Sequence, residues 1–270
     1  MDMPHAATYD DIGFELACVM YNIGAVHAAI AVNEMRDSED SIKNAFMHFQ
    51  YAAWPLQHLR DKLNASKYAS VDFDKDLLTF YVNVLLGQAQ ECLVEKSLID
   101  HRSNLVVAKL TVHLRDLYQE CLRHLDNSSL SDIVSSHRYK QWLRTCAIKS
   151  EMYGAIAMIY MGLQADENKK MGERLGYYSL AGDHQSNLWK LNEKEDRETM
   201  KAAIDFLCDV VMTKYAVFCT INHFFVFFVF PSYITDCPMP RRKMSSFITS
   251  EFLVLMSLGY QLRIVTHRIK

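Results

Sequence analysis

Apolar side chains recur at helical spacing along most of this chain, and the pattern is strongest between Asp76 and Asp126, a stretch with no proline and one glycine. From Leu77 to Ile99 apolar residues fall on almost every face, which is typical of a central, buried helix. From Leu105 to Leu125 they form a narrower stripe, so a second, amphipathic helix is expected. Ser103 or Asn104 is expected to cap it.

The same periodicity predicts further helices on both sides of this pair. Their ranges are 14–35, 41–63, 134–162, 167–191 and 196–215. In the first of them, Ala17, Gly24 and Ala28 belong to a stripe of mostly small residues that would let a neighbouring helix approach closely. No convincing strand pattern occurs before residue 216, so the chain is predicted to be all-α.

The character of the sequence changes at residue 216. An uncharged segment rich in Phe and Val is followed by three prolines and then by Arg241, Arg242 and Lys243. The first apolar run has only about 13 residues and is interrupted by Asn222 and His223, whereas a membrane-spanning helix needs about 20, so no transmembrane span is expected. We expect residues 216–270 to be a tail unrelated to the helical domain, from retained intron or alternatively spliced sequence.

Composition narrows the class of protein. The chain has 270 residues, half of them hydrophobic, which is enough to bury a sizeable core. Its formal charge of −3, with basic and acidic residues interspersed, argues against a nucleic-acid partner. Seven widely spaced cysteines, an odd number, suit the reducing cytosol, and the N-terminus has no secretion signal pattern.

Catalytic motifs are absent from the sequence. There is no glycine-rich phosphate loop, no HExxH, no GxSxG and no pair of CxxC motifs, and no cysteine is followed six positions later by arginine, as a cysteine-dependent tyrosine phosphatase requires. His27 has no second ligand at helical spacing, so it is expected at the core edge or surface. Glu91, Glu95 and Lys96 are expected to form a solvated or ion-paired helix face. We therefore expect no enzyme activity, cofactor or metal.

Four blocks occur in the order found in one known family. They are FELACVMYNIGAVHA (14–28), HFQYAAWPLQHLRDKL (48–63), LLGQAQECLVEKSLIDHRSNLVVAKL (85–110) and KSEMYGAIAMIYMGLQADENKKMGERLGYY (149–178). Together they resemble the BRO domain family, and within it the branch of the His-domain tyrosine phosphatase. The resemblance implies a curved array of long antiparallel helices with a tetratricopeptide-like middle.

The resemblance also implies a function and a site. Members of the family bind the C-terminal amphipathic helix of ESCRT-III subunits, the charged multivesicular body proteins, in endosomal sorting and multivesicular body formation. The family's apolar partner-binding positions correspond here to Leu93, Val106 and Leu110. Periodicity alone would place these aliphatic residues in the core. A cytoplasmic adaptor recruited to endosomes is expected, with other ESCRT components as further possible partners.

The expected layout is a short lead (1–13), a partial BRO domain (14–215) and the tail (216–270). Against the family's pattern, the β-rich N-terminal portion and the closing C-terminal stretch are expected to be missing or replaced. Two alternatives stay open beside the adaptor, namely a generic helical-repeat module that binds another peptide, and a gene-model fragment without independent function.

Overall fold

The computed structural model describes residues 9–192, 201 and 204–205. Every long element in this part of the chain is an α-helix, and no strand occurs in it. The helices are α1 (Ile12–Asn33), α2 (Glu39–Asp61), α3 (Lys75–Ile99), α4 (Asn104–Asn127), α5 (Leu130–Ile133), α6 (Ser136–Glu167) and α7 (Met171–Asn192). The all-α prediction is confirmed, and the predicted boundary at residue 216 lies outside the described residues.

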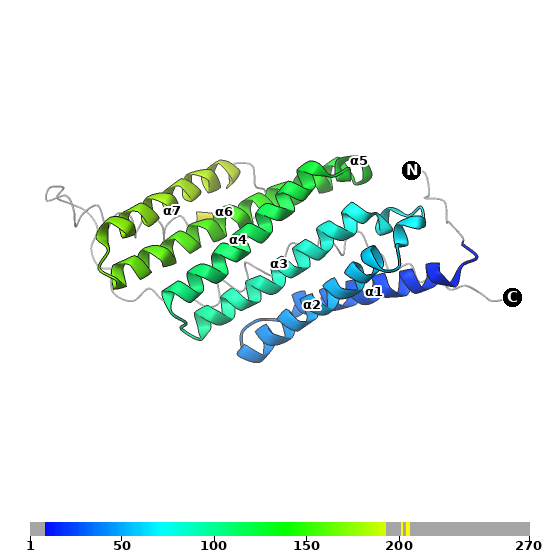
Figure 1. The fold of residues 1–270 in the computed structure, drawn as a ribbon, viewed down its shortest axis with the longest axis horizontal. Helices are drawn as coiled ribbons and strands as arrows, with labels where there is room; N and C mark the ends of the chain where they lie inside the picture. The colour runs from blue at the N-terminus through cyan, green and yellow to red at the C-terminus, as the bar shows by residue number, and fades with distance from the viewer. Residues whose placement is uncertain (1–8, 193–200, 202–203, 206–270) are drawn as a thin grey trace.

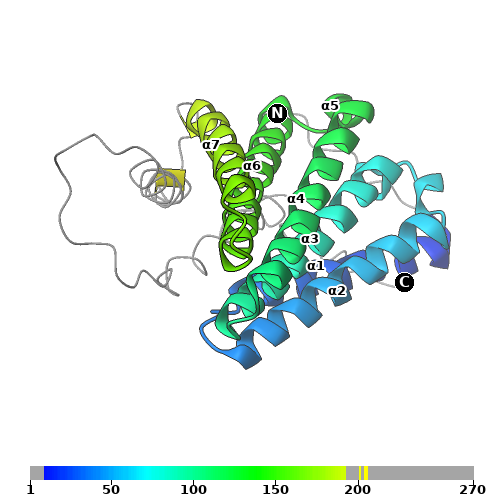
Figure 2. The same cartoon turned by 60° about the vertical axis from the view of Figure 1, so that its left-hand side comes forward.

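The long helices form a sequential array rather than a bundle around one axis. α1 packs on α2, α2 on α3, α3 on α4, α4 on α6 and α6 on α7. α1 and α7 therefore lie at opposite ends of the array (Figure 1). The helix axes turn progressively from α1 and α2 through α3 and α4 to α6 and α7 (Figure 2), which curves the array.

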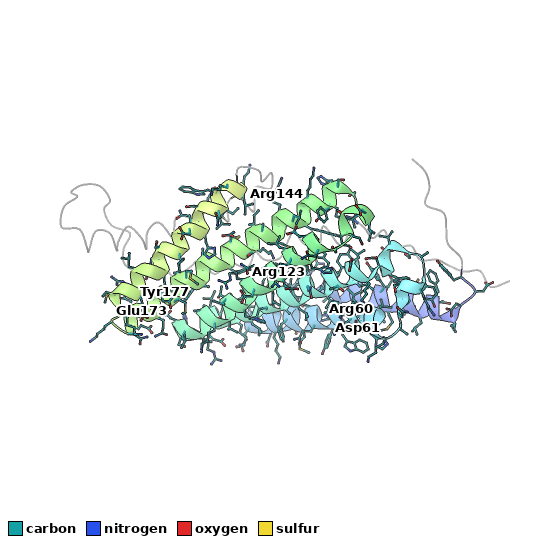
Figure 3. All side chains as sticks on the ribbon, turned by 45° about the horizontal axis from the view of Figure 1, so that its top comes forward. Arg60, Asp61, Arg123, Arg144, Glu173 and Tyr177 are labelled. Carbon is teal, nitrogen blue, oxygen red and sulfur yellow. The ribbon has the colours of Figure 1, made fainter. Side chains whose placement is uncertain are left out.

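Short polar segments set the helix boundaries. Ser38 caps α2 in a capping box with Ser41. Asp74 accepts hydrogen bonds of 2.9 Å from the backbone N–H groups of Asp76 and Leu77 at the start of α3. Ser103 precedes α4, but its side chain makes no capping hydrogen bond. At the other end of α2, Arg60 and Asp61 pair at 2.6 Å on the surface (Figure 3).

The core is continuous along the array. α3 is its centre, as predicted, because most of its side chains are buried, among them Leu78, Phe80 and Leu85 at 0% exposure. The small-residue stripe of α1 is also confirmed, since Gly24 faces the backbone of α2 so closely that an added Cβ would lie 3.1 Å from the carbonyl oxygen of Ala52. The buried cysteines occupy apolar positions and carry free thiols.

Two helices of the described part are long and apolar enough to span a membrane by length and composition alone, α1 and α3. The apolar window of α3 is 78% buried inside the protein, whereas that of α1 is only 28% buried. The composition of α3 is therefore explained by its central place in the core, and the same explanation does not hold for α1.

Candidate partner-binding surface

The surface of interest is formed by the antiparallel pair α3 and α4. The Gln90 Nε2 atom donates to the carbonyl oxygen of Leu110 at 3.1 Å, and at the opposite end of the pair the His124 Nε2 atom lies 2.8 Å from the carbonyl oxygen of Asp76. These two contacts join residues 20 and 48 positions apart, so the chain reverses direction between the helices.

Leu93, Val106 and Leu110 lie on the outer side of this pair. Val106 is 42% exposed, although its neighbour Val107 is 1% exposed. Leu93 is partly exposed between the buried residues Cys92 and Val94. Leu110 is partly buried and packs against the edge of the core.

The three residues gather around one point of the α3–α4 pair. Leu93 lies three residues after Gln90 on α3, and Val106 lies one turn before Leu110 on α4, so the Gln90–Leu110 hydrogen bond brings both pairs together. Leu86, which is 39% exposed, precedes Leu93 by seven residues and shares its face. We refer to Leu86, Gln90, Leu93, Val106 and Leu110 as the α3–α4 surface.

Leu86 is absent from the predicted site. The sequence did indicate that Leu86 lies near Leu93, because the two residues are two helical turns apart and therefore share a face of the helix. This face differs from the most apolar face of the same helix. Sequence periodicity alone did not separate that face from the core, because nearly every face of this helix is apolar.

A cluster of buried charges lies on the opposite face of α3. The Glu91 side chain is fully buried, and its Oε1 atom accepts hydrogen bonds of 2.6 Å from both Tyr118 Oη on α4 and Lys149 Nζ on α6. One turn later, Arg36 Nη1 lies 3.4 Å from Glu95 Oε1. We call Arg36, Glu91, Glu95, Tyr118 and Lys149 the buried charge cluster.

This cluster corrects one expectation. Glu91, Glu95 and Lys96 were expected to form a solvated or ion-paired helix face. Glu91 and Glu95 are ion-paired, but they are buried rather than solvated. Of the three, only Lys96 lies at the surface, where it pairs with Glu39 and Asp100. Both partners, Arg36 and Lys149, come from segments nearly 60 residues away in the chain, so local spacing carries no signal for them.

The charged groups of the buried charge cluster are only partly satisfied by their neighbours. Burial raises the pKa of Glu95 to about 7 although the Arg36 guanidinium opposes that shift. Within the described residues, Glu95 Oε2, Glu91 Oε2 and two nitrogens of Arg36 have no hydrogen-bond partner. Arg36 also has a left-handed backbone with φ of 51°, an arrangement that costs energy and is held by its surroundings.

The chemistry of the described residues does not favour catalysis at this place. Burial raises the pKa of the Cys92 thiol to about 12, so it is not a reactive thiolate at neutral pH. No group of three or more His, Cys, Asp or Glu side chains suited to a metal occurs in the described part of the chain. His27 lies at the edge of the core, with its Nδ1 atom 2.9 Å from Nδ1 of His48.

Known proteins resemble this chain over most of its length. A family model described as the BRO1-like domain matches residues 3–229. The tyrosine-protein phosphatase non-receptor type 23 of Mus musculus is 36% identical over 210 residues, which cover 78% of this chain and 12% of that protein. The ALG-2 interacting protein X of Dictyostelium discoideum is 30% identical over 180 residues, covering 66% of this chain and 22% of the relative.

Solved structures show the same fold. The BRO1 domain of ALIX in complex with CHMP4C matches with a TM-score of 0.70 and 20% identity, over 79% of this chain and 57% of that one. A Bro1 domain solved to explain endosomal targeting matches with a TM-score of 0.67 and 22% identity, over 80% of this chain and 57% of that one. The chain thus spans just over half of these solved chains and about an eighth of the mouse phosphatase.

Proposed function

The chain belongs to the BRO1-like domain family, and we propose that it is a non-enzymatic adaptor that binds the C-terminal amphipathic helix of an ESCRT-III subunit in endosomal sorting. The α3–α4 surface would receive that helix. The observation that carries the proposal is the outward orientation of Leu93, Val106 and Leu110 on one face of a rigid helical pair.

The geometry suits recognition of a helix. An amphipathic helix presents apolar anchors every three or four residues and docks them into an apolar groove on its partner. On the α3–α4 surface, Leu86 and Leu93 are separated by two turns on α3, with Val106 and Leu110 beside them on α4. A partner helix lying along this pair could bury apolar anchors over both helices.

The surroundings support a preformed site. α4 packs on α6 behind the surface, and the side-chain oxygen of Gln164 on α6 accepts a hydrogen bond of 3.1 Å from the backbone N–H of Leu105 at the start of α4. A site held on packed helices loses little conformational entropy on binding, which favours affinity.

The relatives support the same role. The solved ALIX BRO1 domain is in complex with CHMP4C, and relatives of this chain include vacuolar protein-sorting proteins. The match to the phosphatase covers 12% of that protein, so its catalytic activity is not carried over to this chain. We propose a cytoplasmic location with recruitment to endosomes through this contact, and with other ESCRT components as possible further partners.

Peptide binding to the full chain tests the site. A labelled peptide of an ESCRT-III C-terminal helix is titrated by fluorescence polarisation against wild type and against Leu93→Asp, Val106→Asp and Leu110→Asp. Loss of an apolar anchor at the centre of an interface costs at least ~2 kcal/mol, so the Kd should rise by at least about 30-fold. Val106→Asp is the cleanest variant because Val106 is 42% exposed in the free protein.

A matched control is Val71→Asp, since Val71 is 53% exposed but lies outside the α3–α4 surface. It should bind like wild type. Equal binding by wild type and all three surface variants would refute the site, whereas tight binding of an unrelated amphipathic peptide that survives these substitutions would favour a generic helical-repeat module. A cooperative circular-dichroism melt of the full chain separates both from a fragment without a stable fold.

A further inference from the structure

The turn between α1 and α2 is attached to the rest of the protein by one buried side chain. Arg36 is the only buried residue between Asn33 and Ser41, and its side chain is 0% exposed. Its neighbours Met35 and Asp37 are both exposed. The position of this turn therefore depends on what holds the Arg36 guanidinium in the interior.

The contacts that hold Arg36 are few. Its Nη1 atom lies 3.4 Å from Glu95 Oε1, longer than the usual hydrogen-bond range of about 2.7–3.2 Å, and its other two guanidinium nitrogens have no hydrogen-bond partner among the described residues. The guanidinium carbon also lies 5.4 Å from the centre of the Phe49 ring, a cation–π contact. Because the backbone of Arg36 is left-handed, with φ of 51°, one long ion pair holds a residue in a costly conformation.

Of the two carboxylates in the buried charge cluster, Glu95 is the less well paired. Glu91 Oε1 accepts hydrogen bonds of 2.6 Å from Tyr118 and Lys149, whereas Glu95 has the single 3.4 Å contact with Arg36. Glu91 lies one turn before Glu95 on α3, so the two negative charges are close to each other. Glu95 is therefore the carboxylate whose ionised form the surroundings stabilise less.

Several ionisable groups surround Glu95 and its neighbour Glu91. They are Arg36 from the α1–α2 turn, Glu91, Cys92 and Lys96 on α3, Tyr118 on α4, and Lys149 and Tyr153 on α6. Burial raises the pKa of Cys92 to about 12 and also raises the pKa values of Tyr118 and Tyr153, so these three stay neutral near pH 7. The Arg36 guanidinium stays charged.

A proton and the Arg36 guanidinium compete for the Glu95 carboxylate. Burial raises the pKa of Glu95 to about 7, and Arg36 opposes that rise. Since Arg36 makes it harder to protonate Glu95, linkage requires that a proton on Glu95 weaken the attachment of Arg36 equally. The guanidinium would then be buried without a counter-charge, which is unfavourable, and no other buried side chain of the turn keeps it in place.

We propose that Arg36 and Glu95 form a pH-sensitive switch that attaches the α1–α2 turn to α3 when Glu95 is ionised and releases the turn when Glu95 is protonated. On release, the guanidinium moves into solvent and the left-handed backbone of Arg36 relaxes. Glu39 and Lys96 pair at the surface beside the turn, and this pair does not depend on the proton, so release concerns residues 34–38 rather than the packing of α2 on α3. The conformation of this turn thus depends on pH in the neutral range.

Arginine labelling of the full chain tests the switch. Phenylglyoxal is applied at pH 8, 7 and 6, and mass spectrometry compares the labelling of Arg36 with that of Arg123 on α4, whose side chain is 67% exposed. The ratio of the two cancels the pH dependence of the reagent. It should rise at least about fivefold from pH 8 to pH 6, because the protonated fraction of a group with a pKa of about 7 rises roughly ninefold over that range. A ratio that stays constant would overturn the proposal.

Two variants identify the controlling carboxylate. Glu95→Gln has a neutral side chain of the same size, so the labelling of Arg36 should be high at every pH. Glu39→Gln removes a carboxylate beside the same turn whose side chain is 67% exposed, and it should keep the wild-type profile. Thermal melts at each pH verify that the proteins are folded. A Glu95→Gln profile that still changes with pH as wild type does, or a Glu39→Gln profile that no longer changes, would exclude Glu95 as the controlling group.

Trypsin cleavage gives a second measurement, which uses wild type alone. Initial cleavage after Arg36 is compared with cleavage after Lys169, which is exposed in the turn between α6 and α7 and is also left-handed, with φ of 57°. Cleavage after Arg36 relative to Lys169 should rise several-fold from pH 8 to pH 6.5. A relative rate that does not change with pH would mean that the α1–α2 turn keeps its attachment when Glu95 is protonated, and the switch would be wrong.

Discussion

Replacing Lys149 by methionine should destabilise this protein more than any exposed lysine substitution. Lys149 Nζ donates to Glu91 Oε1 at 2.6 Å and to Tyr118 Oη at 3.2 Å, and the Glu91 side chain has no exposed surface. Without the ammonium group, a buried carboxylate loses its counter-charge. Removing one partner of a buried ion pair costs about 3–5 kcal/mol, a large share of the roughly 5–15 kcal/mol that holds a domain folded.

The reciprocal single variant and the double variant together isolate the interaction energy between Glu91 and Lys149 from the other contacts of the two residues. Glu91→Met should also be costly, because it leaves the Lys149 ammonium buried. The double variant carries two apolar side chains in place of two charges, and such replacements are close to neutral when the volume is preserved. The double variant should therefore be more stable than either single variant, with a coupling energy of at least ~2 kcal/mol.

Urea unfolding of the full chain, followed by far-UV circular dichroism, measures all four free energies of the cycle. Lys190→Met on the exposed side of α7 is the matched control and should shift the free energy of unfolding by less than about 0.5 kcal/mol. A cost below ~1 kcal/mol for Lys149→Met, or single costs that simply add in the double variant, would refute the buried ion pair.

Two further stability predictions follow from the interior. The melting temperature of Glu95→Gln relative to that of wild type should rise as the pH rises from 4.5 through 7, because burial raises the pKa of Glu95 from 4.5 to about 7 and only wild type loses stability in this window. Between these two pH values the folded protein keeps a proton that the unfolded chain releases, so the free energy of unfolding of wild type falls by on the order of 3 kcal/mol as the pH rises. Thermal melts of both proteins at several pH values measure this change. A difference in melting temperature that does not vary with pH would contradict a raised pKa for Glu95. Gly162→Ala should destabilise by about 1–3 kcal/mol, because an added Cβ would overlap the buried ring of Tyr178, whereas Gly176→Ala meets nothing within 4 Å and should stabilise by about 0.5–1 kcal/mol. Equal melting shifts for both glycine variants would argue against the packing of α6 on α7.

Helix periodicity was sufficient to predict the long helices of the described residues, whereas the predicted helix 196–215 lies almost entirely outside them. The predicted ranges 14–35, 41–63 and 167–191 correspond to Ile12–Asn33, Glu39–Asp61 and Met171–Asn192. The short helices Ala65–Lys67, Val71–Phe73 and Leu130–Ile133 were not predicted, because segments of three or four residues have no measurable apolar period. They depend on packing contacts such as those of buried Phe73 and Leu130.

The candidate site was harder to predict than the fold. Periodicity alone would have placed Leu93, Val106 and Leu110 in the core, and the resemblance to a family singled them out as partner contacts. The structure shows why the two criteria disagree. Leu110 contacts the core edge while Val106 is exposed, so a stripe defined only by spacing contains both kinds of residue. Their role in binding stays a prediction that the peptide titration addresses.

Two features of α3, the buried carboxylate of Glu91 and the outward-facing side chain of Leu93, have a common physical explanation. Glu91 and Leu93 are two residues apart, so they point about 200° apart around the helix. The carboxylate enters the interior and is held there by Tyr118 and Lys149 from two other helices, and this fixes the rotation of α3 about its axis. Because apolar packing alone is tolerant on a helix that is apolar on nearly every face, we expect the directional ion pair to contribute to keeping Leu93 facing outward. Loss of the pair should therefore weaken peptide binding at the α3–α4 surface even at temperatures where the variant remains folded, and a Lys149→Met protein that is folded yet binds the peptide like wild type would show that packing alone sets the rotation.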